Sequence, residues 1–170
     1  LEVVGQGSCG TVYRAFDPEL QRVVAIKIPR GGRFLTDAEQ DRFLREGRSM
    51  ARLKHPGLVP VYEVGRVDEM VYIATEFIEG KTLGEAMADR EFGPTEAATL
   101  IKQLAVALHH AHEQGVIHRD LKPSNVMLEL DSQPSRCSPR EQSVSFAERT
   151  TTMLDSESQA TLTPRITDFG

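Results

Sequence analysis

The sequence predicts an α+β fold in which a β-rich first part precedes a helical second part. Residues 1–30 contain β-branched and aromatic runs separated by glycines and by Asp17-Pro18, a pattern typical of strands joined by turns. Residues 37–54 carry apolar side chains at helical spacing on one face, which predicts a helix. A longer helix is expected to begin at Pro94 and to end at Gly115, since proline suits a first helical turn and glycine a helix end.

The same patterns predict the remaining elements. Further strands are expected at 58–64, 70–78, 126–128 and 165–167. A polar turn at 65–69 joins the first two of these strands, and Leu83–Asp89 is expected to form a short helix. The longer helix has a stripe of apolar residues that we expect to be buried: Ala97, Leu100, Ile101, Leu104, Leu108 and Ala111.

Composition narrows the class of protein. With 170 residues, 39% apolar and 26% charged, the chain can bury one sizeable core or two small lobes. The 20 basic residues are scattered and the net charge is -5, which argues against a nucleic-acid-binding surface. Cys9 and Cys137 lie in different contexts, so we expect no disulfide framework and a cytoplasmic location. No apolar run reaches transmembrane length, although a longer parent protein could be anchored through other segments.

The most informative segment is His118-Arg119-Asp120-Leu121-Lys122-Pro123-Ser124-Asn125, which is expected to be a loop because Pro123 interrupts any helix. Asp120 can accept a proton from a hydroxyl group, and Lys122 can neutralise a phosphate. Asn125 offers an oxygen to a magnesium ion. These groups are the equipment of phosphoryl transfer, where catalysis consists of positioning and charge neutralisation.

A glycine-rich segment near the start of the chain fits the pattern G-x-G-x-x-G-x-V, with Gly5, Gly7, Gly10 and Val12 at the fixed positions. This pattern also occurs in dinucleotide-binding folds, where the third glycine opens a helix. Here β-branched and aromatic residues follow, so the segment is expected to join two strands and to cover nucleotide phosphates with its backbone N–H groups. The alternative is a plain hairpin turn.

Two further charged residues lie in apolar surroundings. Lys27 ends the run Val24-Ala25-Ile26-Lys27 on a strand otherwise suited to burial, and Glu46 lies on the apolar face of the helix at 37–54. Either charge would be costly if it were buried alone, so we expect the two to form an ion pair. The alternative is that both side chains point to solvent. The chain ends with Asp168-Phe169-Gly170, in which Asp168 could bind a magnesium ion.

In this order, the glycine segment, Lys27, Glu46, the Asp120 loop and Asp168 resemble the domain of eukaryotic-type serine/threonine protein kinases. The resemblance implies a protein-kinase-like fold, with a β-rich N-lobe containing one helix over 1–77. A hinge and the beginning of a helical C-lobe would follow over 78–170. It also implies ATP and Mg²⁺ as cofactors, a protein substrate with a Ser or Thr hydroxyl, and phosphorylation as the reaction.

Roles for individual residues follow from this resemblance. Asp120 would orient and deprotonate the substrate hydroxyl, and Lys122 would stabilise the transferred phosphoryl group. Lys27, fixed by Glu46, would hold the α- and β-phosphates. Asn125 and Asp168 would hold magnesium. The remaining nucleotide-binding residues would be Gly5, Gly7, Gly10, Val12, Ala25, Thr75, Glu76, Ile78 and Met127.

The sequence departs from the family pattern in two places. Residues 129–165, with twelve Ser or Thr and three Pro, separate the Asp120 loop from Asp168 where the family has a tight hairpin. We expect an exposed insertion whose ends still pair as short strands, and which is either inert or a phosphorylation target. The chain also ends before any activation segment, so we expect it to be a fragment that is inactive or barely active alone.

The sequence therefore predicts a serine/threonine protein kinase. The alternatives are a nucleotide-binding pseudokinase or scaffold and a small-molecule phosphotransferase with a similar fold. Intact Lys27, Glu46, Asp120, Asn125 and Asp168 oppose the pseudokinase reading.

Overall fold

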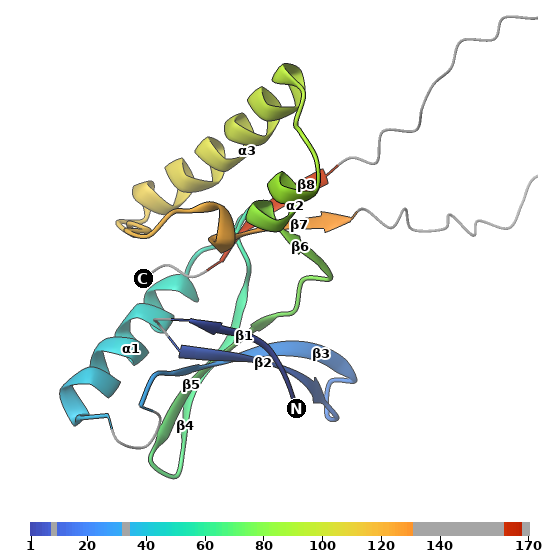
Figure 1. Ribbon diagram of the computed structural model, residues 1–170. Helices are drawn as coiled ribbons and strands as arrows, with labels where there is room; N and C mark the ends of the chain where they lie inside the picture. The colour runs from blue at the N-terminus through green and yellow to red at the C-terminus, as the bar shows by residue number, and fades with distance from the viewer. Residues whose placement is uncertain (8–9, 32–34, 131–161, 168–170) are drawn as a thin grey trace, which may run out of the picture.

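The computed structural model describes residues 1–7, 10–31, 35–130 and 162–167, and these residues form two layers of structure stacked one above the other in Figure 1. The first is a five-stranded antiparallel sheet with the strand order β1-β2-β3-β5-β4. Its strands are β1 (Glu2–Gly7), β2 (Gly10–Asp17), β3 (Arg22–Pro29), β4 (Val61–Val67) and β5 (Met70–Glu76). The predicted β-rich first part is confirmed.

Helix α1 (Asp37–Met50) packs on one face of this sheet. A capping box starts the helix: the Glu39 carboxylate accepts from the Thr36 backbone N–H at 2.8 Å, and the Thr36 hydroxyl accepts from the Glu39 N–H at 3.4 Å. Gly47 lies against the side chains of Ile73 and Val64, which brings the helix close to β5 and β4.

Two predicted boundaries in this part were wrong by a few residues. The helix expected over 37–54 ends at Met50, where the chain turns so that Leu53 enters the core, 6% exposed. The strand expected over 58–64 is β4, which begins only after Pro60 because proline has no N–H to donate to a ladder. The polar turn lies at Asp68, whose φ of +52° tightens it, so β4 continues to Val67.

The second layer contains a three-stranded sheet and two helices. Its sheet has the order β6-β7-β8, formed by β6 (Gly80–Thr82), β7 (Val126–Leu130) and β8 (Leu162–Ile166). The helices are α2 (Leu83–Asp89), which confirms the predicted short helix, and α3 (Pro94–Glu113). A single 3₁₀ turn, η2 (Pro123–Asn125), leads into β7.

Strands β7 and β8, which lie before and after the long insertion, pair in antiparallel fashion as the two arms of a hairpin. The two ends of the segment predicted as an insertion, 129–165, therefore pair as short strands, as expected. Pro164 is accommodated there since β8 is an edge strand of its sheet. The Thr150-Thr151-Thr152 run and the rest of 131–161 lie outside the described residues.

A shared apolar core joins the two layers. Its buried residues come from the α1–β4 connection, from α3 and from β8: Leu53, Leu58, Ala107, Ala111 and Ile166. The stripe predicted for α3 was partly wrong, because Ile101 is 67% exposed whereas Ala107 is fully buried. Leu100, Leu104, Ala107 and Ala111 are spaced by three or four residues, and Ile101 falls beside that stripe.

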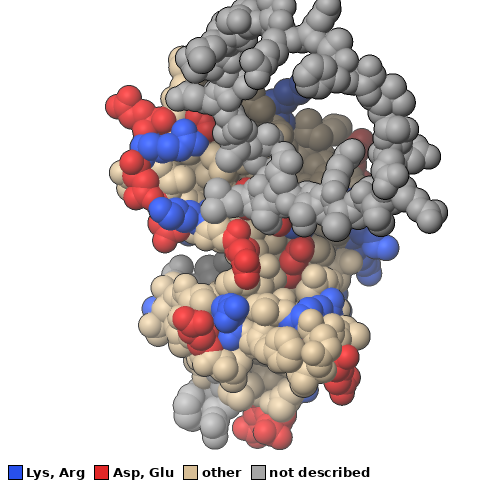
Figure 2. Space-filling view, turned by 90° about the vertical axis from the view of Figure 1, so that its right-hand side faces the viewer, with Lys and Arg blue, Asp and Glu red and all other residues tan. Residues whose placement is uncertain are grey.

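None of the described helices is long and apolar enough to cross a membrane. Figure 2 shows one face of the molecule, on which basic and acidic side chains lie next to one another. Over the described part of that face they form no broad basic field.

Candidate active site

The candidate site is built around the loop that follows α3. Gly115, with a φ of +74°, ends the helix, and the Val116 N–H donates to the Ala111 carbonyl across the end of the helix at 2.9 Å. The chain then enters the His118–Asn125 segment. His118 is 2% exposed, and its Nε2 lies 2.8 Å from the Thr167 carbonyl oxygen on the strand side of the site. This contact ties the loop to the residues directly before Asp168.

Three predicted site residues meet within this loop. Lys122 Nζ lies 2.6 Å from Asp120 Oδ2. Asn125 Nδ2 donates to the Asp120 carbonyl at 2.9 Å and to Asp120 Oδ2 at 3.4 Å. The structure therefore brings an acid, a cation and an amide together as the sequence spacing suggested, with the Asp120 carboxylate at their centre.

Asn125 is the anchored member of this group, since it is only 8% exposed. Its carbonyl accepts from the Thr167 N–H at 2.9 Å and from the Thr167 hydroxyl at 3.1 Å. Because Nδ2 is engaged with Asp120, Oδ1 is the amide atom suited to a hard cation. Asp168, the other predicted magnesium ligand, lies outside the described residues but directly follows Thr167.

The environment of Asp120 keeps its carboxylate ionised. The hydrogen bond from Lys122 is the largest cause that lowers the pKa of Asp120 below its ordinary value of 3.8, with smaller contributions from Asn125 and His118. Removing a nearby cation should reverse this shift. At neutral pH the loop therefore presents an anionic oxygen paired with an ammonium group.

We expect Lys122→Met to raise the pKa of Asp120 toward 3.8, measured as the pH midpoint of its carboxyl carbon chemical shift in NMR spectra. A carboxyl group whose pKa is lowered in the folded state stabilises the fold at pH values above its ordinary pKa. This contribution is lost as the pH falls through the folded-state pKa. The variant should therefore lose less stability on acidification. Lys81→Met, which removes an exposed partner of Asp89, is the matched control and should leave the pKa of Asp120 unchanged.

The glycine segment forms the β1–β2 hairpin, with Gly7 paired to Gly10. This confirms that the segment joins two strands and does not open a helix, as a dinucleotide-binding fold would require. The two residues at its tip, 8–9, including Cys9, lie outside the described residues.

The predicted adenine-binding and phosphate-binding side chains of the large sheet share one face. Lys27 pairs with Val12 on β2, and Ala25 pairs with Thr75 on β5. Residues paired across a ladder point to the same side, and alternate residues of one strand do so too. Lys27 also pairs with Ile73, whose side chain touches α1. The nucleotide-facing set therefore lies on the face that α1 covers.

The expected Lys27–Glu46 ion pair is not found among the described residues. Glu46 instead accepts from Arg42 Nε at 2.9 Å, one helical turn earlier on α1. A local i,i+4 pair forms without any long-range approach of helix to strand, which gives Arg42 an advantage over a residue on β3.

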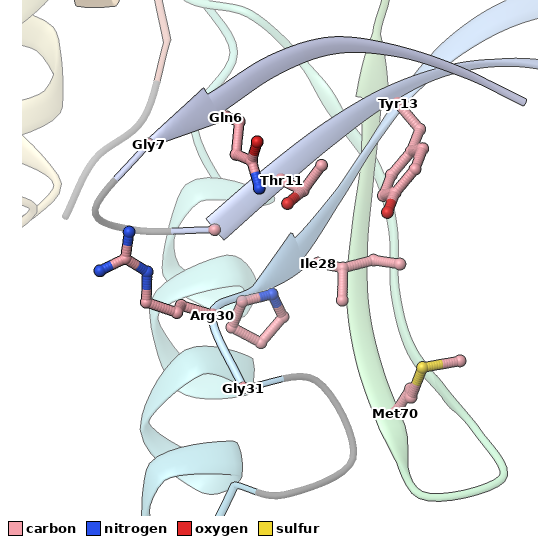
Figure 3. A pocket seen from close by; sticks show the side chains of 10 residues that line it. Gln6, Gly7, Thr11, Tyr13, Ile28, Arg30, Gly31 and Met70 are labelled. Atoms are coloured by element: carbon pink, nitrogen blue, oxygen red, sulfur yellow. The ribbon is translucent and has the colours of Figure 1, made fainter.

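A pocket of about 330 Å³ lies elsewhere on the sheet. Figure 3 shows the side chains that line it. Thr11, Tyr13 and Ile28 line it, and each is adjacent in sequence to a residue of the nucleotide-facing set, Val12 or Lys27. Adjacent strand residues point to opposite faces, so this pocket opens on the far side of the sheet from the predicted nucleotide site.

Comparison with known proteins decides the family. The family model described as protein kinase domain matches residues 1–170. The chain belongs to the protein kinase family. Among curated relatives, serine/threonine-protein kinase PrkC of Bacillus subtilis is 39% identical over 130 residues, covering 76% of this chain and 20% of that protein. Serine/threonine-protein kinase PknD of Chlamydia pneumoniae is 35% identical over 145 residues, covering 78% and 16%.

Solved structures agree with this kinase assignment. The Mycobacterium tuberculosis PknI kinase domain superposes with a TM-score of 0.67 at 30% identity, covering 77% of this chain and 54% of that one. Rad53 in complex with AMP-PNP superposes with a TM-score of 0.72 at 26% identity, covering 99% and 37%. The predicted kinase fold is confirmed. The chain spans about a fifth of the length of curated relatives such as PrkC.

Sequence reasoning missed one residue near the site. Arg165 of β8 contacts both Glu76 and Glu129, and these contacts span 89 and 36 positions of sequence. The only sequence signal was an arginine shortly before Asp168, which does not indicate its partners.

Proposed function

We propose that this kinase-family chain carries the nucleotide site and catalytic loop of a serine/threonine protein kinase, which transfers the γ-phosphoryl group of ATP to a protein hydroxyl. The observation that carries the proposal is the arrangement of Lys122 and Asn125 around the Asp120 carboxylate, at 2.6 Å and 3.4 Å from its Oδ2. The names of the relatives support the Ser/Thr class.

In the proposed reaction, Asp120 orients the substrate hydroxyl and accepts its proton. A bond forms between the hydroxyl oxygen and the γ-phosphorus while the bond to the bridging oxygen breaks, and ADP leaves. Lys122, already 2.6 Å from Asp120, offsets negative charge on the transferred group. A carboxylate whose pKa is lowered is a weak base. The role of Asp120 is therefore chiefly to orient the hydroxyl until its oxygen bonds to phosphorus and its proton becomes acidic.

The donor set fits ATP and magnesium. One face of the large sheet presents small or apolar groups that suit an adenine ring, from Val12, Ala25 and Thr75. Lys27 lies on the same face and would contact the phosphates. Asn125 Oδ1 and the Asp168 carboxylate are hard oxygen ligands of the kind magnesium prefers. When bound, magnesium neutralises phosphate charge.

We also propose the lobe division expected from the sequence: an N-lobe over 1–77, and a hinge with part of the C-lobe over 78–170. Two apolar side chains of α3, Ile101 and Val106, are 67% and 52% exposed. No other described residue covers these two side chains, so an apolar patch on α3 is exposed. We infer that the 170-residue chain alone is marginally stable and inactive or barely active.

The alternative is a nucleotide-binding pseudokinase or scaffold. The pairing of Glu46 with Arg42 does not separate it from a working kinase, because a working kinase also breaks its Lys–Glu pair when it is switched off. The two candidates differ in whether bound ATP is turned over.

The test uses the complete natural protein, magnesium and ATP labelled at the γ-phosphate. It compares transfer to Ser, Thr and Tyr peptides and to small hydroxyl compounds, while calorimetry measures ATP binding. Labelled Ser or Thr peptides support the proposal. ATP binding without transfer favours the pseudokinase, and label on small compounds alone favours a small-molecule phosphotransferase. Absence of ATP binding rejects the kinase, the nucleotide-binding pseudokinase and the small-molecule phosphotransferase, and leaves the scaffold.

A further inference from the structure

Arg165 links three strands through one side chain. It lies in β8, and its side chain is 13% exposed. Its Nη2 donates to Glu76 Oε2 at 2.6 Å, and its Nη1 donates to Glu129 Oε2 at 3.2 Å. Glu76 ends β5 in the large sheet and Glu129 lies in β7, so the guanidinium fastens the small sheet to the large one.

This bridge differs from the surface ion pairs of the described chain. The Lys81–Asp89 pair, for example, has side chains that are 64% and 56% exposed, and solvent screens such pairs. The Arg165 guanidinium is largely shielded from water, and its planar fork contacts a different carboxylate with each terminal nitrogen. Without it, two carboxylates would face each other across the junction of the sheets.

The bridge lies beside the residues proposed to surround adenine. Glu76 ends β5 just before the proposed hinge. Met127, another of the predicted nucleotide-binding residues, is the register partner of Arg165 in the β7–β8 ladder. Backbone hydrogen bonds hold β8 at the next residue, where Ile166 N–H donates to the Gly57 carbonyl at 2.9 Å and Val59 N–H donates to the Ile166 carbonyl at 3.0 Å. Arg165 supplies the corresponding link on the hinge side.

We propose that Arg165 is a positioning residue for the adenine end of the nucleotide site, and this rests on the proposed function. It sets the spacing between the end of β5 and the strand that carries Met127. Because Arg165 acts on the adenine end, its loss weakens the binding of adenosine and the binding of ATP by similar factors. A residue that acts on the phosphates, such as Lys27, affects ATP and spares adenosine.

The experiment measures the dissociation constants of adenosine and of magnesium ATP by calorimetry, using the complete natural protein. We expect Arg165→Met to raise both dissociation constants by roughly 10-fold, which is the scale of one lost hydrogen bond to a charged group. Arg165→Lys should recover part of this loss because it keeps the charge. Adding Glu76→Gln to Arg165→Met should also recover part, since it removes one of the two facing carboxylates.

The matched control is Arg22→Met. Arg22 pairs with Asp17 at 3.4 Å and stacks over the Tyr62 ring, neither of which is a proposed nucleotide-binding residue, so its loss should leave both constants unchanged. If wild type binds ATP and Arg165→Met binds adenosine equally well, the inference is wrong while the proposed function stands. If wild type binds neither ligand, both are wrong.

A second variant keeps the test decisive if Arg165→Met does not fold, as judged by circular dichroism. Glu76→Gln leaves Arg165 in place with Glu129 and removes only the charge at the end of β5. It should raise the dissociation constants of adenosine and ATP by the same factor, which should be smaller than the factor for Arg165→Met. Loss of ATP affinity alone would place the effect at the phosphates and overturn the inference.

Discussion

Replacing Asp120 with asparagine is expected to reduce phosphoryl transfer to peptides by about 10²- to 10⁴-fold, the usual contribution of a positioned proton acceptor. Asparagine has nearly the same shape, and it retains an oxygen that can accept from Lys122 and Asn125. It lacks the negative charge and cannot take the hydroxyl proton. ATP affinity should remain within about threefold, because the loss falls on the transition state rather than on the bound nucleotide.

The measurement is the initial rate of peptide phosphorylation by the complete natural protein, with ATP binding measured separately by calorimetry. Asp89→Asn is a closely matched control, since Asp89 also pairs with a lysine, Lys81, at 2.5 Å on an exposed surface. It should leave the rate unchanged. Equal rates for wild type and Asp120→Asn would contradict the assigned role of Asp120.

Local patterns predicted the elements of this fold well where one cause dominates. Pro94 and Gly115 marked the limits of α3 because each favours a particular helix end. Apolar spacing predicted the start of α1, and the structure has a capping box at Thr36 and Glu39 that fixes this helix end locally. The end of α1 was misplaced because Leu53 leaves the helix to join a core made with α3 and β8, which is a tertiary effect.

The candidate site shows the same division. Asp120, Lys122 and Asn125 lie within six positions of one loop, so their spacing alone brought them together. The Lys27–Glu46 pair depends on how closely α1 approaches β3, and sequence spacing carries no information on that distance. Arg42 competes for Glu46 from one helical turn away, a spacing that is visible in the sequence.

Of the changes that affect stability, Gly10→Ala is expected to have a large effect, destabilising the fold by about 3 kcal/mol. Gly10 begins β2 with a φ of +142°, a conformation that residues with a side chain rarely adopt. A Cβ there would lie 2.1 Å from the Ile28 carbonyl oxygen and 2.9 Å from Pro29 Cα. Both neighbours are backbone atoms of the paired strand β3, so relief requires the ladder to separate.

Gly7 provides the control within the same hairpin. A Cβ at Gly7 meets no atom within 4 Å, and its φ is not in the positive region, so Gly7→Ala should change stability by at most about 1 kcal/mol. Urea unfolding of both variants, compared at equal m-values, gives the two free energies. The two glycines occupy equivalent-looking places in the motif, yet only Gly10 is required by the backbone. Similar costs for both substitutions would mean that the β2–β3 ladder is not the constraint at Gly10.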